Sequence, residues 1–422
     1  MLLQIGNLPR IAPAAHRDGG AKMLADVMPD GAWAGQRCFI IGGGPSLKGF
    51  DFSRLRGELV IGINRAYEYI DPAVLFTMDL RFTGWASRGE LGANSREKSE
   101  SREKFNALRA TKTIIRNQEV PAGFCAIARA NQSELTFSIE SGFNNQNNSG
   151  FGALNLALCL GADPIYLLGF DMRGNADSGR QEWFHTGYPT VQPNYVYNDF
   201  LALFYRHANE INRRARVINC NPDSALRCFE FGDMPEARQR PLVVGFYTHG
   251  TGYETEAREM AASAHRMGLD GYLRAIDNRG WQRNTQFKAW FLRAMVARHQ
   301  GRTIVYTDAD SRFARYPALF DDAAFRGIRY HLHKGRELLS GTLQIHCDAS
   351  TSKLMDLWVE ECEKNPHIWD QQALASAVAR WDGNRGELPK EYCCIFDSKP
   401  LPAAPVVVHY QASRRLKQEV GA

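Results

Sequence analysis

Residues 302–314 read RTIVYTDADSRFA, and the interpretation of the second half of the chain depends on this stretch. The apolar run 303–306 predicts a buried strand, which leads into Asp308 and Asp310. Two carboxylates one residue apart repel each other unless water, a cation or a basic group offsets their charge. One interpretation is a solvated turn with an Asp cap on the next helix. The other is a divalent metal that in turn holds a diphosphate.

Length and composition indicate an ordinary globular protein with two domains. The chain has 422 residues, of which 44% are hydrophobic and 23% charged, whereas single cores stop growing at roughly 250–300 residues. The formal charge of +5 suits a phosphate-bearing ligand and would tolerate nucleic acid without requiring it. Nine cysteines without a Cys-x-x-Cys pair argue against zinc and disulfide frameworks. No run approaches the ~18 apolar residues of a membrane span, so we expect a cytoplasmic protein.

Short apolar runs alternate with helical patterns along the whole chain. The runs end in polar or glycine-containing turns, which is typical of a parallel sheet flanked by helices, with ligands bound at the carboxyl ends of the strands. The polar, proline-containing segment FGDMPEARQRP precedes a new apolar run and separates two such patterns. We therefore predict an α/β protein of two domains, each a mainly parallel sheet with flanking helices. The predicted parts are an arm (1–35), a first domain (36–232), a linker (233–240), a second domain (241–415) and a tail (416–422).

A glycine-rich turn, GGGPSLKGFDFSRL at 42–55, follows the first predicted strand. Glycines allow close approach of a ligand to the backbone, and free N–H groups beside a helix start favour phosphate. The turn lacks both the G-x-G-x-x-G spacing and the lysine of a P-loop, so a plain tight turn is the alternative. Other polar groups at predicted strand ends are Asn64, Asp79 and Asp171.

This turn, together with NNSGFGALNLALCLGADPIYLLGFDM and WFH, resembles the Rossmann-like domain of bacterial CMP-sialic acid sialyltransferases. It is also similar to 6-hydroxymethylpterin diphosphokinase-like proteins and to phage proteins. The resemblance implies that His185 is a general base. The alternative is that His185 is simply a half-buried aromatic residue. The sequence departs from the sialyltransferases at Gly43, where they usually have Asn. The expected nucleotide-binding residues are Gly42, Gly43, Gly44, Ser46, Asn64, Ser149, Gly150 and Asp171.

Several polar residues of the second half could meet around a nucleotide. Thr248 ends a predicted strand that could carry the base and ribose. Lys288 could reach a diphosphate or could simply be solvated. Carboxylates such as Asp308 and Asp310 are ligands that Mg²⁺ and Mn²⁺ accept alongside phosphate oxygens. His409, at the end of VVVH, could add an imidazole ligand, although a lone histidine there is more often a surface residue.

The order of these elements over 241–415 resembles GT-A-fold glycosyltransferases that use nucleotide-diphospho-sugars. The resemblance implies that Asp308, Asp310 and His409 bind Mn²⁺ or Mg²⁺. Gly341 and Thr342 would border the sugar pocket. Asp370, followed by Gln371 at the head of a helix, would lie near the acceptor as the candidate base of an inverting reaction, or would be a helix N-cap.

The resulting expectation is a metal-dependent glycosyltransferase that moves a sugar from a nucleotide sugar to a glycan or other hydroxyl acceptor. The first domain would be a second transferase or an acceptor-binding module. Two alternatives remain open: a phage-type enzyme that glycosylates DNA bases, and a non-catalytic nucleotide-binding or virion-associated protein. Under the phage-related resemblance, the expected location is the cytosol of a bacterium or of an infected host. The sequence leaves the donor sugar, the stereochemistry and the oligomeric state undetermined.

Overall fold

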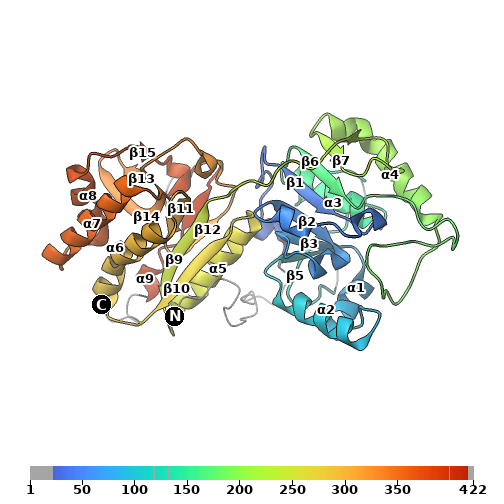
Figure 1. The fold of residues 1–422 in the computed structure, drawn as a ribbon, viewed down its shortest axis with the longest axis horizontal. Coiled ribbons are helices and arrows are strands. Elements are labelled where there is room, and N and C mark those ends of the chain that lie inside the picture. Colours follow the sequence, from blue (N-terminus) through green and yellow to red (C-terminus); the bar gives the residue numbers. More distant parts are fainter. Residues whose placement is uncertain (1–21, 117–118, 131–133, 399, 417–422) are drawn as a thin grey trace. The chain divides into compact units, whose positions relative to one another are not determined.

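The chain divides into two units between Arg238 and Gln239, and each unit has its own sheet (Figure 1). The computed structural model describes residues 22–116, 119–130, 134–398 and 400–416. Both units are built of sheets flanked by helices, which confirms the predicted α/β class with two sheet-containing domains. The division falls inside the segment 233–240 that the sequence suggests as the linker.

The sheet of the first unit is entirely parallel, with the order β5-β4-β3-β2-β1-β6-β7-β8. The chain proceeds from β1 toward one edge and returns to β6 on the other side of β1. Ligands bind beside such a reversal in open parallel sheets. The strands are β1 (Cys38–Ile41), β2 (Leu59–Ile63), β3 (Val74–Thr77), β4 (Thr111–Ile115), β5 (Phe124–Ile127), β6 (Ile165–Leu168), β7 (Val217–Asn219) and β8 (Glu230–Phe231).

Helices cover this sheet because its central strands are apolar on both faces. All four residues of β1 are buried, and so is almost every residue of α3. The sequence does not predict the strands β5 and β8, because runs this short show no recognisable alternation of apolar and polar residues. The helices of this unit are α1 (Leu80–Arg88), α2 (Ser95–Ala107), α3 (Ser149–Cys159) and α4 (Val196–Asn212).

The prediction of a separate arm over residues 1–35 is wrong for its described part. Residues 22–35 pack on the first unit, where Leu24, Met28 and Trp33 are fully buried. Gly31 N also donates a backbone hydrogen bond to Cys159 O at 2.9 Å. Burial of these apolar side chains holds the segment on the first unit in spite of its many Gly, Ala and Pro residues. Residues 1–21 lie outside the described residues.

The second unit has a mixed sheet with the order β10-β9-β11-β14-β13-β15 and a small sheet β12-β17-β16. In the larger sheet, β14 is antiparallel to both neighbours, and the other three pairings are parallel. The strands are β9 (Leu242–Thr248), β10 (Gly271–Ile276), β11 (Thr303–Thr307), β12 (Ser311–Phe313), β13 (Ile328–His333), β14 (Glu337–His346), β15 (Arg385–Glu387), β16 (Cys394–Ile395) and β17 (Val407–His409).

Helices cover both faces of this larger sheet. From β9 the chain passes through α5 to β10 at the edge, and then back through α6 to β11. Because both crossovers are right-handed by rule, the two helices lie on opposite faces. Helices α7 and α8 extend the layer of α6, and together they enclose a core that includes Phe291, Trp358 and Leu374. The helices are α5 (Gly252–Arg266), α6 (Trp281–Arg298), α7 (Ala349–Lys364), α8 (Asp370–Arg380) and α9 (Ser413–Leu416).

The predicted tail, 416–422, begins one residue too early. Leu416 is the last residue of α9 and is buried, because its apolar side chain packs onto the second unit. Residues 417–422 lie outside the described part of the chain.

Candidate functional site

The second unit contains a cavity of about 510 Å³ where β9 and β11 end. The side chains on its wall come from both sheets and from the starts of α6 and α8. Eight residues singled out in the sequence lie on this wall: Thr248, Lys288, Asp308, Asp310, Gly341, Asp370, Gln371 and His409.

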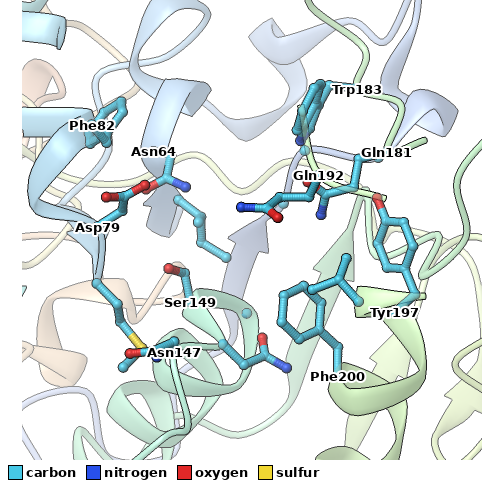
Figure 2. Close-up of a pocket in the computed structure, with 18 of the residues that line it drawn as sticks. Asn64, Asp79, Phe82, Asn147, Ser149, Gln181, Trp183, Gln192, Tyr197 and Phe200 are labelled. Atoms are coloured by element: carbon cyan, nitrogen blue, oxygen red, sulfur yellow. The ribbon is translucent and has the colours of Figure 1, made fainter. Parts of the chain in front are cut away.

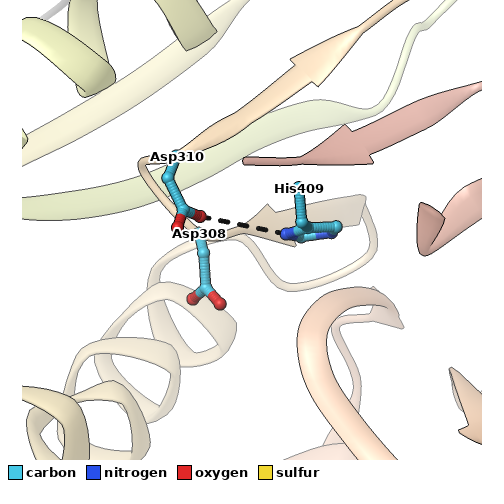
Figure 3. A group of neighbouring side chains, drawn as sticks. All are labelled: Asp308, Asp310 and His409. Atoms are coloured by element: carbon cyan, nitrogen blue, oxygen red, sulfur yellow. Dashed lines mark ion pairs between the residues drawn. The ribbon is translucent and has the colours of Figure 1, made fainter. Parts of the chain in front are cut away.

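Two antiparallel pairings bring the acids and the histidine together. Thr307 is paired with Thr342, and Asp308 N donates to Gly341 O at 3.0 Å, which fixes Asp308 beside β14. In the small sheet, Ser311 is paired with His409, which places the imidazole beside Asp310 although 99 positions separate them in the sequence (409 − 310 = 99). Figure 3 shows the three side chains gathered at the end of these strands.

Asp308, Asp310 and His409 can each offer one ligand atom, and these atoms lie within 4.8 Å of one another. Tyr306 Oη donates to Asp308 Oδ1 at 2.7 Å, and Ala412 N donates to Asp310 Oδ2 at 2.7 Å. Burial and the neighbouring Asp308 carboxylate raise the pKa of Asp310. Two acids held this close lower their repulsion when a cation lies between them, so the set has the chemistry of a divalent metal site.

The imidazole of His409 is held by a partner outside the cavity wall. Thr342 Oγ1 lies 2.8 Å from His409 Nε2 and does not itself line the cavity, contrary to the expected sugar-pocket position. Nδ1 lies 4.0 Å from Asp310 Oδ1. A hydrogen bond at one ring nitrogen orients the other nitrogen toward a metal.

Gly341 leaves space for an ion beside the cluster. A Cβ atom at this position would lie 3.1 Å from His409 Cε1 and 3.2 Å from Asp308 Oδ2. Any side chain would therefore crowd both a carboxylate and the imidazole. Acid and imidazole donors beside a position that a side chain would crowd are compatible with Mg²⁺ or Mn²⁺.

Lys288 links this cluster to Asp370. The Nζ atom lies 3.1 Å from Asp308 Oδ1 and 2.8 Å from Asp370 Oδ2, and it donates to Ser340 Oγ at 3.1 Å. Ser340 Oγ in turn donates to Asp370 Oδ2 at 2.7 Å. Burial acts to lower the pKa of Lys288, but Asp308 and Asp370 raise it overall, so the ammonium stays charged. Its positive charge offsets the two carboxylates here, whereas the sequence suggested a direct contact with diphosphate.

Three contributors to this site were missed in the sequence: Tyr306, Ser340 and Trp369. Tyr306 sits inside an apolar strand run, where its hydroxyl gives no sequence signal. Ser340 does share a face with Thr342 and Gln344 in β14, and polar residues at alternate positions of a buried strand are a usable signal. Trp369 precedes Asp370 and lines the same cavity.

The first unit has a second cavity, of about 590 Å³, at the point where its strand order reverses. Figure 2 shows the amides of Asn64 and Gln192 turned toward the same space, with Ser149 on another part of the wall. Of the residues predicted to bind nucleotide here, seven line the wall: Gly42, Gly43, Gly44, Asn64, Ser149, Gly150 and Asp171. Ser46 and His185 do not.

The glycine turn is tight because the chain itself fills the space beside it. A Cβ at Gly43 would meet Trp183 at 2.8 Å, and one at Gly44 would overlap the Asp171 carboxylate. Asp171 accepts hydrogen bonds from Ser46 N at 3.1 Å, Ser46 Oγ at 2.7 Å and Asn221 Nδ2 at 2.9 Å. These contacts account for the glycines and for Asp171 through packing, as in the plain-turn alternative.

His185 is buried among aromatic rings. Its ring stacks on Trp183 at 6.2 Å and packs beside Tyr188 at 5.1 Å. Burial and the positive charge of Arg65 lower its pKa to about 3. An imidazole this weakly basic and away from the cavity wall does not favour the predicted role of general base.

The fold and the clusters define a two-unit α/β protein with two separate cavities. No protein-family model and no curated protein matches the chain. The solved structures that the chain matches include a glycosyltransferase involved in the glycosylation of the major capsid of PBCV-1, with 13% identity and a TM-score of 0.32 over 41% of this chain and 96% of that one.

Two further solved structures were found. The MAf glycosyltransferase from Magnetospirillum magneticum AMB-1 has 15% identity and a TM-score of 0.32, over 51% of this chain and 35% of its own. GlyE from Streptococcus pneumoniae TIGR4 has 15% identity and a TM-score of 0.32, over 41% of this chain and 55% of its own. Similarity this low does not assign a family or a function, and the likeness to sialyltransferases and phage proteins stays a prediction.

None of the helices in the described part of the chain combines the length and the apolar character needed to cross a membrane.

Proposed function

We propose that the second unit is a metal-dependent glycosyltransferase that takes a nucleotide-diphospho-sugar as donor and a hydroxyl group as acceptor. The observation that carries this proposal is the convergence of Asp308, Asp310 and His409 on the wall of one cavity. The cavity also presents Thr248 at the end of β9, where the resemblance to GT-A enzymes implies the nucleotide lies.

Asp308, Asp310 and His409 would hold Mn²⁺ or Mg²⁺, which when bound supplies positive charge to a departing diphosphate. Thr342 fixes the imidazole, and Tyr306 fixes one oxygen of Asp308. These supports keep the ligand atoms in place before the donor arrives, so little reorganisation is needed.

Asp370 is proposed as the base that accepts the acceptor hydroxyl proton in an inverting reaction. Lys288 and Ser340 both contact its Oδ2 atom, which orients the carboxylate and leaves Oδ1 to accept the proton. Because Asp370 begins α8 and Trp369 holds the N-cap position, its carboxylate does not serve as the helix cap that the sequence offered as an alternative.

The first unit is proposed to bind a nucleotide in its own cavity, as a second transferase or as an acceptor-binding module. Its support is the position of the cavity at the carboxyl ends of β1, β2, β3 and β6, beside the reversal of strand order. Asn64, Ser149 and Gly150 are the residues we assign to this ligand, since packing already accounts for the glycines 42–44, Ser46 and Asp171.

The proposal is tested by hydrolysis of UDP- and GDP-sugars with and without Mn²⁺. We expect Mn²⁺-dependent hydrolysis in the native protein and a loss of about 10²-fold or more in the Asp308→Ala/Asp310→Ala protein. Full activity in that variant would rule out the metal role. Absence of heat in calorimetry with Mn²⁺ and nucleotide would favour a non-catalytic protein, and a salt-dependent gel shift of DNA would favour the base-modifying alternative.

A further inference from the structure

One exposed large apolar side chain of the second unit lies on the wall of its cavity. Trp369, which lines the cavity, is 54% exposed. Exposed aromatic rings beside a polar cavity are typical of ligand-binding sites.

Trp369 occupies a position where the helix itself favours another residue. It is the N-cap of α8, where Ser, Thr, Asp or Asn would satisfy a free backbone N–H, and its side chain makes no capping hydrogen bond. The helix is capped in part from Gln372, whose Oε1 accepts from Trp369 N at 3.1 Å. Trp369 departs from the N-cap preference and its side chain is not buried in the core. Such a departure is expected at positions that serve a function.

The neighbours of Trp369 carry the polar groups that a polyhydroxylated ligand needs. Asp370 and Gln371 follow it directly, and both line the cavity. Gln371 Nε2 donates to Glu337 Oε1 at 3.1 Å, which orients the amide at the rim. A pyranose ring has an apolar C–H face and hydroxyl groups around its edge, so a flat ring beside carboxylate and amide groups matches it.

We propose that the acceptor is a carbohydrate, and that one of its sugar rings stacks on Trp369 so that a hydroxyl group faces Asp370. This inference rests on the proposed glycosyltransferase function of the same cavity. It commits the acceptor to a glycan and excludes a protein side chain or a DNA base.

Binding of simple saccharides tests the inference without requiring turnover. Lactose, maltose, cellobiose and chitobiose at millimolar concentration are measured by saturation-transfer NMR with the full chain, Mn²⁺ and UDP or GDP. At least one should give signals on its ring C–H protons. The saturation-transfer signals should fall about five- to ten-fold in Trp369→Asn, where Asn is a favoured N-cap residue and so preserves the start of α8. The signals should persist in Trp369→Phe, which keeps an aromatic ring.

The matched control is Tyr195→Asn, which removes an exposed aromatic ring at the N-cap of α4 in the first unit and should leave the signals unchanged. The inference is overturned if no saccharide binds, or if binding survives in Trp369→Asn. It is also overturned if that variant instead raises the KM for the nucleotide sugar, which would place the indole on the donor. If the protein binds a saccharide through Trp369 but hydrolyses no nucleotide sugar with Mn²⁺, the proposed function is wrong. The inference that the cavity binds a carbohydrate would still hold.

Discussion

At the scale of single residues, the candidate metal site depends as much on a missing side chain as on the ligands. Gly341 lies in the middle of β14, where any residue can adopt the backbone conformation, yet an added Cβ would crowd His409 and Asp308. Lys288 also depends on residues that are distant in the sequence, because Asp308 and Asp370 balance its charge.

The Gly341→Ala substitution should weaken metal binding without unfolding the protein. The neighbours at 3.1 and 3.2 Å must shift by a few tenths of an ångström, which disturbs the ligand atoms. We expect Mn²⁺ affinity to fall about ten-fold or more, measured by titration calorimetry. Gly232→Ala is the matched control, since its added Cβ meets only the Ile218 side chain at 3.0 Å in the first unit. Equal Mn²⁺ affinity in both variants would contradict the idea that a side chain at position 341 disturbs the metal ligands.

At the scale of elements, strand pairing brings the site together. The β12–β17 pairing places His409 beside Asp310, and the β11–β14 pairing places Gly341 beside Asp308. In the first unit, Asp171 connects the turn after β1 to the segments that follow β6 and β7. A polar residue at a strand end can therefore hold loops together instead of holding a ligand.

The Asp171→Ala substitution should destabilise the first unit. It leaves the buried Asn221 amide without its acceptor and removes two hydrogen bonds from the exposed Ser46, which together cost roughly 1–3 kcal/mol. Urea unfolding, with hydrogen exchange to follow each sheet separately, measures the effect. Asp223→Ala removes a nearby exposed acid and serves as the control. Unchanged stability combined with lost nucleotide binding would restore Asp171 as a ligand.

At the scale of the whole molecule, the two units each bury their own core and carry their own cavity. Ligand binding stabilises only the part of a protein whose folded state binds the ligand. Because the first unit is proposed to bind a nucleotide of its own, the stabilisation that depends on the metal is the part that belongs to the second unit.

Calorimetric melting should show two transitions, and adding Mn²⁺ to UDP or GDP should raise the Tm of only the one assigned to the second unit. When the free ligand is at a hundred times its Kd, the free energy of unfolding rises by about 2.7 kcal/mol, which corresponds to a shift of several degrees in Tm. EDTA should abolish the shift. The same shift in the Asp308→Ala/Asp310→Ala protein would contradict binding through the acid cluster.

The sequence by itself determined the α/β class, the region of the break between units, the strand that ends at Thr248 and the strand that leads into Asp308 and Asp310. These features follow from local apolar periodicity and from the residues that end each strand, which the chain encodes within a few positions. The resemblance implied that Asp308, Asp310 and His409 meet, and only the tertiary structure decided the contacts of the other polar residues and the geometry of all of them. The distance between His409 and Asp310, the Lys288 bridge to Asp370, and the packing roles of Asp171 and His185 all depend on pairings between segments far apart in the chain, whose register local sequence does not encode.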